Sequence, residues 1–359
     1  MADQGGASRP CVVLININGS GIGHLSTCLA YANRLQSDVR PVFFSFASAI
    51  EQIHDMGFEA DYMVSRFWSR AGSVAYDRQL AQRLGMLFER VRPELVVFDG
   101  TWPYRGLLHA AKVYGLPRLV WSDLTLYKQG KRKVPVREDN FDLLLRLGEI
   151  GADFAVERGE FPARTVTLPP VTILRDSELL DRRSARSELG LLPDKRYALF
   201  SLGPGNLKDV TDIGAGLIGE FSRHGYEVRW ARAPISRSDP SLPPGATPIS
   251  IYPIARYLRA FDVFVSAAGY NSCCEVIQSR VPTLFVPNKL VSDDQIRRAE
   301  LVVEAAPAVI SSCETTADRE AAVRELLALI DKAPAARCPV KLDGAEHAAR
   351  EILALISDP

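Results

Sequence analysis

A histidine behind a run of glycines is the first feature near the start of this chain that could do chemistry. In NGSGIGHLS (18–26), three alternating glycines precede His24. Gly21 and Gly23 let the backbone turn tightly and bring its amides close to a bound group. The imidazole of His24 could accept a proton from a hydroxyl nucleophile, or it could only cap or pack the start of a helix. Placement alone does not separate these two interpretations.

Glycines and an amide side chain recur in FSLGPGNLKD (200–209). Gly203 and Gly205 free the backbone here, and Asn206 can donate a hydrogen bond toward a diphosphate. Taken by itself, however, this pattern is more typical of a structural turn between a strand and a helix.

The most specific pattern lies in residues 266–300, where Gly269 precedes a predicted helix. The first turn of that helix holds three polar residues, Tyr270, Asn271 and Ser272. Free amides and the helix dipole favour an anionic phosphate at such a terminus. Glu275 follows about one turn later, where its carboxylate could accept hydrogen bonds from both hydroxyls of a ribose.

A polar loop after the next predicted strand ends in Asp294 and Gln295. Short polar groups of this kind suit sugar hydroxyls, although Ser-Asp-Asp before a helix is also ordinary capping. The ordered succession of glycine, polar helix start, carboxylate and polar loop favours a binding site. No acidic pair is placed to hold magnesium, so we expect no metal.

The composition excludes several classes of function. Lys plus Arg and Asp plus Glu both number 43 in 359 residues, so no overall positive field would gather nucleic acid. The six cysteines have no zinc-ligand spacing, and no window approaches the roughly 18 apolar residues of a membrane span. The first residues show no signal-peptide pattern. We therefore expect a cytoplasmic protein with reduced thiols.

Strands and helices must alternate to position these segments. Short apolar runs of strand length occupy 11–17, 41–46, 94–100, 117–123, 196–202, 226–231, 261–267 and 283–287, with helical patterns between them. This order predicts parallel sheets with helices on both faces, whose ligands collect beyond the carboxyl ends of the strands. The alternation pauses between 157 and 195, and paired prolines near 168–170 indicate a boundary there. We predict domains over 9–168 and 169–340, followed by a helix within 341–359.

Carboxylates at strand ends refine this prediction. Asp99 ends the strand 94–100, where it could bind an acceptor, assist a base or only cap the following turn. The second strand ends in FFSFASA without an acidic residue for a ribose, which argues against a nicotinamide dinucleotide site.

Together, these segments resemble the GT-B nucleotide-sugar glycosyltransferases of family 28, which are related to the peptidoglycan lipid-intermediate N-acetylglucosaminyltransferase. GSGIGH resembles the family's first glycine loop, and SLGPGN resembles its second. Gly269, Glu275, VPTLFVP and Gln295 follow the family's donor-site pattern. The resemblance implies an α/β GT-B fold, with two Rossmann-like doubly wound domains facing across a cleft.

The resemblance also implies how a UDP-sugar donor would be held. Glu275 would bind the ribose, and the turn of Gly269, Tyr270, Asn271 and Ser272 would bind the diphosphate. Ile251 would meet the uracil through its backbone, and Asp294 and Gln295 would touch the sugar. Arg175 resembles an arginine that faces the diphosphate. Asp294 stands where the family has a second glutamine, so the donor sugar stays open.

The implied reaction is a direct, inverting and metal-independent transfer to an unidentified hydroxyl acceptor, with His24 as the base and UDP-sugar as co-substrate in place of a cofactor. The family's apolar membrane-docking patch is not recognisable in the first half of the sequence. The basic run 127–137 could contact an anionic head group at the membrane periphery or could be merely solvated. The alternatives are a UDP-sugar hydrolase, a UDP-sugar 2-epimerase of the same fold and a nucleotide-sugar-binding protein that catalyses nothing.

Overall fold

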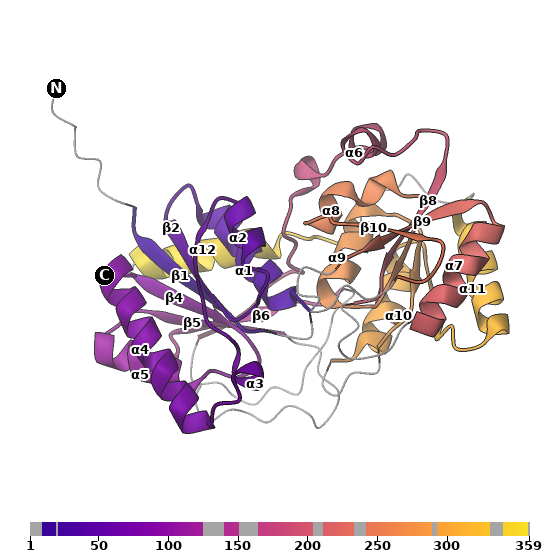
Figure 1. Cartoon of the computed structure of the whole chain (residues 1–359). Helices are drawn as coiled ribbons and strands as arrows, with labels where there is room; N and C mark the ends of the chain where they lie inside the picture. Colours follow the sequence, from indigo (N-terminus) through magenta and orange to yellow (C-terminus); the bar gives the residue numbers. More distant parts are fainter. Residues whose placement is uncertain are drawn as a thin grey trace.

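Two parallel sheets with flanking helices make up the computed structural model (Figure 1). It describes residues 9–18, 21–124, 140–150, 164–203, 211–232, 242–288, 293–330 and 340–357. Every strand pair in both sheets is parallel, as the alternation of apolar runs and helical patterns predicts.

The first sheet has the strand order β3-β2-β1-β4-β5-β6-β7. Its strands are β1 (Cys11–Asn16), β2 (Arg40–Ser45), β3 (Glu59–Tyr62), β4 (Leu95–Asp99), β5 (Leu119–Leu124), β6 (Leu143–Leu147) and β7 (Arg164–Thr167). The helices of this half are α1 (Gly23–Leu35), α2 (Glu51–Asp55), α3 (Arg66–Ser69), α4 (Ser73–Val91) and α5 (Arg105–Tyr114). One face of the sheet packs on α1, and the other packs on α4 and α5.

The second sheet has the strand order β10-β9-β8-β11-β12-β13. Its strands are β8 (Arg196–Ser201), β9 (Tyr226–Ala231), β10 (Ala246–Ile249), β11 (Val263–Ser266), β12 (Thr283–Phe285) and β13 (Ala308–Ile310). The helices of this half are α6 (Arg182–Glu188), α7 (Thr211–Arg223), α8 (Ile254–Tyr257), α9 (Tyr270–Ser279), α10 (Gln295–Ala305) and α11 (Thr316–Ile330), with short 3₁₀ turns η2 (Asp176–Glu178) and η3 (Leu258–Ala260). α7 and α11 cover one face, while the face with α9 and α10 shares a continuous apolar core with the first sheet.

Five strands go beyond those that the sequence predicts, namely β3, β6, β7, β10 and β13. β3, β7 and β10 lie at sheet edges with mostly half-exposed or exposed residues, so their sequences lack a clear apolar run. β13 has three residues, which is too short for a periodicity. β6 is buried throughout, but the charge of Arg146 interrupts its apolar run.

The chain adds strands toward one side of each sheet and then toward the other. This reversal of strand order falls between β1 and β4 in the first sheet and between β8 and β11 in the second. Helices that follow neighbouring strands leave toward opposite faces at such a point, which opens room for a ligand at the carboxyl ends of the strands. His24 and Asp99 lie at the first reversal. Gly203 and Gly269 lie at the second.

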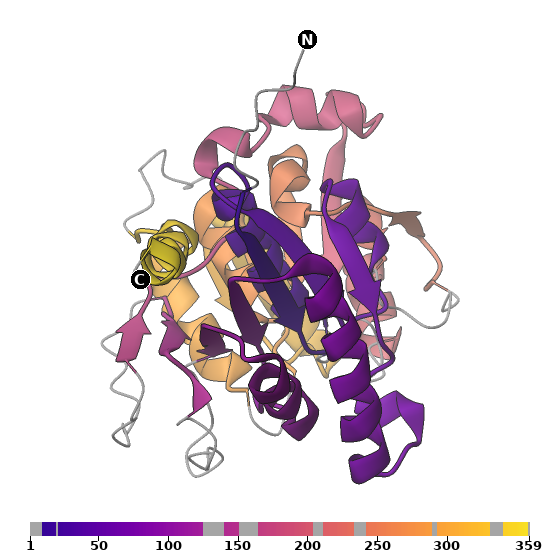
Figure 2. The ribbon, with the colours of Figure 1, turned by 90° about the vertical axis from the view of Figure 1, so that its left-hand side faces the viewer.

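The chain passes between the two halves twice. Helix α12 (Gly344–Ser357) follows the second sheet but packs against α1 of the first half (Figure 1; Figure 2). The two crossing segments touch, because a β-carbon built on Gly344 would lie 2.0 Å from the carbonyl oxygen of Pro169. A β-carbon built on Gly148 would likewise lie 2.1 Å from the carbonyl oxygen of Leu168. The domain limits at 168 and 341 stay predictions.

Gly344→Ala is expected to lower the free energy of unfolding by about 1–3 kcal/mol, because the added methyl group must push the Pro169 backbone away. Gly219→Ala is the matched control, since Gly219 is an exposed residue within α7 with no atom near its would-be β-carbon. Alanine there should raise stability by about 0.5–1 kcal/mol. Denaturant titration of both variants measures the difference, and equal stabilities would contradict the close approach at Gly344.

Candidate active site

His24 and Asp99 form a hydrogen-bonded pair at the reversal between β1 and β4. His24 is the second residue of α1, and Asp99 ends β4. The imidazole Nδ1 lies 2.6 Å from Asp99 Oδ1, with 15% of the His24 side chain and 3% of the Asp99 side chain exposed. An ionised carboxylate only accepts hydrogen bonds, so Nδ1 donates to Asp99, and in the neutral ring the lone pair then lies on Nε2. This arrangement can remove a proton from a hydroxyl group.

Two buried hydroxyl groups in series hold the second carboxylate oxygen of Asp99. Ser122 Oγ donates to Asp99 Oδ2 at 2.6 Å, and the hydroxyl of Tyr31 lies 3.0 Å from the same serine oxygen. Because Ser122 donates to Asp99, Tyr31 must donate to Ser122. Burial, and next the charge of Asp99, raise the pKa of Tyr31 well above its ordinary value, so the phenol keeps this proton.

The sequence does not predict the roles of Ser122 and Tyr31. One signal was available, because the last buried residues of adjacent strands are polar. In the observed register, Asp99 pairs with both Asn16 and Ser122 on its neighbouring strands. A row of polar strand ends across one sheet edge therefore indicates the site.

The starts of α1 and α9 meet where the two halves of the chain adjoin (Figure 1). Asn271 Nδ2 donates to the carbonyl oxygen of Gly23 at 3.4 Å, and Ser26 Oγ lies 3.0 Å from the Tyr252 hydroxyl. Both helix starts carry positive dipole ends and free amides, a combination that favours an anionic group between them. The structure thus brings the His24–Asp99 pair next to the predicted diphosphate turn.

The predicted diphosphate turn is only partly available to a ligand. Gly269 is the N-cap of α9 and no side chain caps the helix, while Asn271 and Ser272 are half-buried. The side chain of Tyr270 is buried, and its hydroxyl donates to the carbonyl of Gly148 at 3.0 Å. The same hydroxyl accepts from a backbone amide of the interdomain segment. Tyr270 can therefore offer a diphosphate only its own backbone amide.

Glu275 lies one turn along α9, beside the phenol of Tyr252. None of the described residues hydrogen-bonds or ion-pairs with its carboxyl group. Burial raises the pKa of Glu275 to about 8. The group is therefore an unpaired titratable acid at the predicted ribose position, and it has hydrogen-bonding capacity to spare for a ligand.

The free energy of unfolding is expected to fall as the pH rises from about 4.3, where a free glutamate titrates, to about 8. The folded chain holds the Glu275 proton across this window and the unfolded chain does not, so the slope is negative and reaches at most about 1.4 kcal/mol per pH unit. Urea titrations of the wild type and Glu275→Gln at four pH values isolate this contribution, because all other groups are common to both. Parallel stability curves would count against the raised pKa.

Asp294 and Gln295 mainly shape their own loop. Asp294 Oδ1 accepts from the amide of Arg297 at 3.2 Å, so the capping interpretation applies to this side chain. Gln295 is buried, and its Oε1 accepts from the amide of Asn288 at 2.9 Å. A contact of either residue with a donor sugar stays a prediction.

Among the other predicted site segments, some lie within the described residues and some lie outside them. Ile251 is nearly buried just after β10, and Gly203 has a φ of 93°, a backbone conformation that favours glycine. Gly205, Asn206 and the basic run 127–137 lie outside the described residues.

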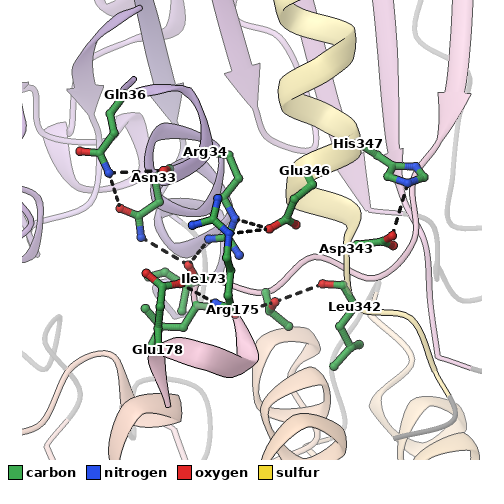
Figure 3. A network of polar contacts seen from close by, with 12 residues as sticks. Asn33, Arg34, Gln36, Ile173, Arg175, Glu178, Leu342, Asp343, Glu346 and His347 are labelled. Atoms are coloured by element: carbon green, nitrogen blue, oxygen red, sulfur yellow. Dashed lines mark hydrogen bonds and ion pairs between the residues drawn. The ribbon is translucent and has the colours of Figure 1, made fainter. Parts of the chain in front are cut away.

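Arg175 does not face the predicted diphosphate turn. Its Nε lies 3.2 Å from Glu346 Oε1 of α12, and the same carboxylate oxygen accepts from Arg34 of α1 at 2.9 Å (Figure 3). Arg34 also donates to the carbonyl oxygen of Ile173. The sequence prediction is wrong because Arg175 belongs to the polar network that joins α12, α1 and the interdomain segment.

Several large apolar side chains are exposed in the first half, where the family's apolar membrane-docking patch is not recognisable from the sequence. Phe67 is 81% exposed and lies edge-on to Trp68 in α3. Other large apolar residues of the neighbouring segments are exposed as well, namely Val64, Val74 and Trp102. They are scattered along the sequence, so no run of apolar residues predicts their exposure. Among the described helices, none has the length and apolar character needed to cross a membrane.

Comparison with known proteins agrees with this architecture. Residues 229–350 match the glycosyltransferase family 28 C-terminal domain. The chain is superimposable on the calicheamicin glycosyltransferase CalG4 with a TM-score of 0.63 at 16% identity, covering 98% of this chain and 100% of that one. For MurG of Acinetobacter baumannii the TM-score is 0.57 at 14% identity, covering 96% and 99%. The protein thus has the GT-B fold, as the sequence predicts.

Curated enzymes share sequence similarity with this chain. The UDP-N-acetylglucosamine--N-acetylmuramyl-(pentapeptide) pyrophosphoryl-undecaprenol N-acetylglucosamine transferase of Nocardioides sp. is 26% identical over 75% of this chain and 74% of its own length. The enzyme of the same name from Bacillus licheniformis is 22% identical over 64% of this chain, and the match spans 63% of that enzyme, less than two thirds. The chain therefore has the GT-B fold and is similar in sequence to the family 28 glycosyltransferases.

Proposed function

We propose that this protein transfers a sugar from a UDP-sugar to an acceptor hydroxyl, with His24 as the general base. The observation that carries the proposal is the His24–Asp99 pair beside the meeting point of two helix starts. A base and an anion-binding terminus in contact are what a hydroxyl nucleophile and a diphosphate leaving group require. The names of the sequence relatives make UDP-N-acetylglucosamine the first donor to test.

The geometry supports a direct displacement. Nε2 of His24 takes the proton of the acceptor hydroxyl while its oxygen bonds to the anomeric carbon and the bond from that carbon to the diphosphate oxygen breaks. Asp99 stabilises the imidazolium that forms, and amides at the start of α9 stabilise the charge on the departing UDP. Attack from the side opposite the leaving group inverts the anomeric centre.

Activity is expected to survive chelation with EDTA, because helix amides neutralise the leaving diphosphate. The adjacent carboxylates Asp293 and Asp294 support this, since the first pairs with Arg298 and the second caps α10. Turnover with and without EDTA, followed by added magnesium, measures the requirement. Loss of activity that magnesium restores would show that a metal takes part.

Product analysis distinguishes transfer from its alternatives. Purified protein is incubated with a panel of UDP-sugars, with and without candidate hydroxyl acceptors, and the products are identified by mass spectrometry. Transfer predicts a glycosylated acceptor and acceptor-dependent UDP release. Free sugar from donor alone indicates a hydrolase, an epimerised donor indicates an epimerase, and UDP binding without turnover indicates a binding protein.

The exposed Trp102, three residues beyond Asp99, favours acceptors that carry an apolar group.

A further inference from the structure

A buried arginine connects the two halves of the chain beneath the proposed donor site. Arg298 lies on α10 and its side chain is 0% exposed. Its Nε and Nη2 donate to the two carboxylate oxygens of Glu149 at 2.9 and 2.8 Å. Glu149 follows β6 of the first sheet, so this two-bond fork joins the second half of the chain to the first.

The same guanidinium holds both loops of the proposed donor site. Arg298 Nη1 donates to the carbonyl oxygen of Ala268, directly before the N-cap of α9, at 3.3 Å. Arg298 Nη2 lies 2.8 Å from Oδ1 of Asp293, directly before the N-cap of α10. The helix starts predicted to bind the diphosphate and the sugar are thus fixed relative to Glu149.

Tyr270 strengthens this connection. Its ring centroid lies 5.8 Å from the Arg298 guanidinium, and its hydroxyl donates to the carbonyl of Gly148, next to Glu149. Two connections therefore join the start of α9 to residues 148–149: the hydroxyl of Tyr270 bonds to Gly148, and Arg298 links Ala268 to Glu149. Because a guanidinium forms several bonds in one plane, lysine at position 298 could not replace all of these contacts.

We propose that Arg298 is a positioning residue for the donor diphosphate, holding the starts of α9 and α10 in register with Glu149 of the other half. The inference rests on the proposed function, since it takes the start of α9 as the diphosphate site. It follows that a residue of the first half, remote in sequence from the donor site, controls diphosphate affinity. No hydrogen bond or ion pair of the described residues joins Glu275 or Ile251 to Arg298 or Glu149, so we expect the predicted ribose and uracil contacts to persist when these bonds are lost.

The test compares UDP with uridine, which lacks the diphosphate, by calorimetry on the full chain. Glu149→Gln is expected to raise the Kd of UDP about 10-fold and to leave the Kd of uridine unchanged. Asp262→Asn is the matched control, because Asp262 accepts from the buried Arg186 at 3.0 Å within the second half alone. It lies at the opposite, amino end of β11, so its loss should lower the melting temperature without changing the UDP-to-uridine ratio.

Each outcome of the calorimetry either supports or overturns the positioning role of Arg298. A selective loss of UDP affinity in Glu149→Gln supports the positioning role, and an equal loss for both ligands or an unchanged Kd with a lower melting temperature overturns it. If Glu149→Gln does not fold, the double variant Glu149→Met, Arg298→Met removes both members of the fully buried ion pair together, leaves only the partly exposed Asp293 without its arginine, and is expected to show the same selective loss. A wild type that binds uridine and UDP equally would instead remove the diphosphate site and the proposed function with it.

Discussion

Replacement of His24 by alanine is expected to lower kcat by about 10²- to 10⁴-fold, the usual contribution of a positioned general base. The affinity for UDP should barely change, because the proposed nucleotide contacts come from the second half of the chain. Steady-state kinetics with a transferable UDP-sugar and calorimetry with UDP measure the two quantities separately. A variant with the wild-type kcat would reduce His24 to a packing residue.

Two further variants sharpen this experiment. Asp99→Asn keeps the shape of the side chain but removes the charge that stabilises the imidazolium, so kcat should again fall by about 10²-fold or more. His109→Ala is the matched control, since His109 is exposed on α5, away from the carboxyl ends of the strands. Its kcat should equal that of the wild type.

Glu275→Ala is expected to weaken the binding of both UDP and uridine by about 5- to 150-fold, equivalent to about 1–3 kcal/mol, because the hydrogen bonds of the ribose lose their partner. The melting temperature should not fall, since the described structure gives this carboxyl no hydrogen bond or ion pair to lose. Calorimetry with both ligands measures the effect. Glu325→Ala, an exposed change on α11, is the control.

Binding of a deoxynucleotide tests directly whether Glu275 contacts the ribose. The wild type should bind 2′-deoxy-UDP more weakly than UDP, and Glu275→Ala should bind the two with the same affinity, because the missing hydroxyl and the missing carboxyl affect one interaction. An alanine variant that still discriminates between them would place the ribose elsewhere.

The sequence locates the candidate residues His24 and Asp99 through local patterns. The position of His24 follows from a glycine run between a strand and a helix, and Asp99 follows from the end of a buried strand. Both signals lie within a few residues of the functional group. Ser122 and Tyr31 could not be found this way, since their role depends on which strands are neighbours and on the register between them.

The failures share a physical cause. Tyr270 has the right position for its amide to meet a phosphate, yet its side chain extends into the other half of the chain, which no local pattern reveals. Arg298 lies in an amphipathic helix where an arginine ordinarily faces solvent, and its burial depends on the carboxylates of Glu149 and Asp293, which local sequence does not reveal. Arg175 was misplaced because the helix that carries Glu346 arrives from the far end of the sequence.

The return of α12 to the first half has a consequence for synthesis. Ala348 and Ile352 of this helix are buried in the core that also contains Leu25 and Leu29 of α1. While the ribosome is still translating the second half, the nascent first half lacks this cover, and apolar surface on α1 stays open until residues 344–357 have emerged. We therefore expect the first half to begin folding before the second and to be completed after it, unlike domains that finish one after another during translation.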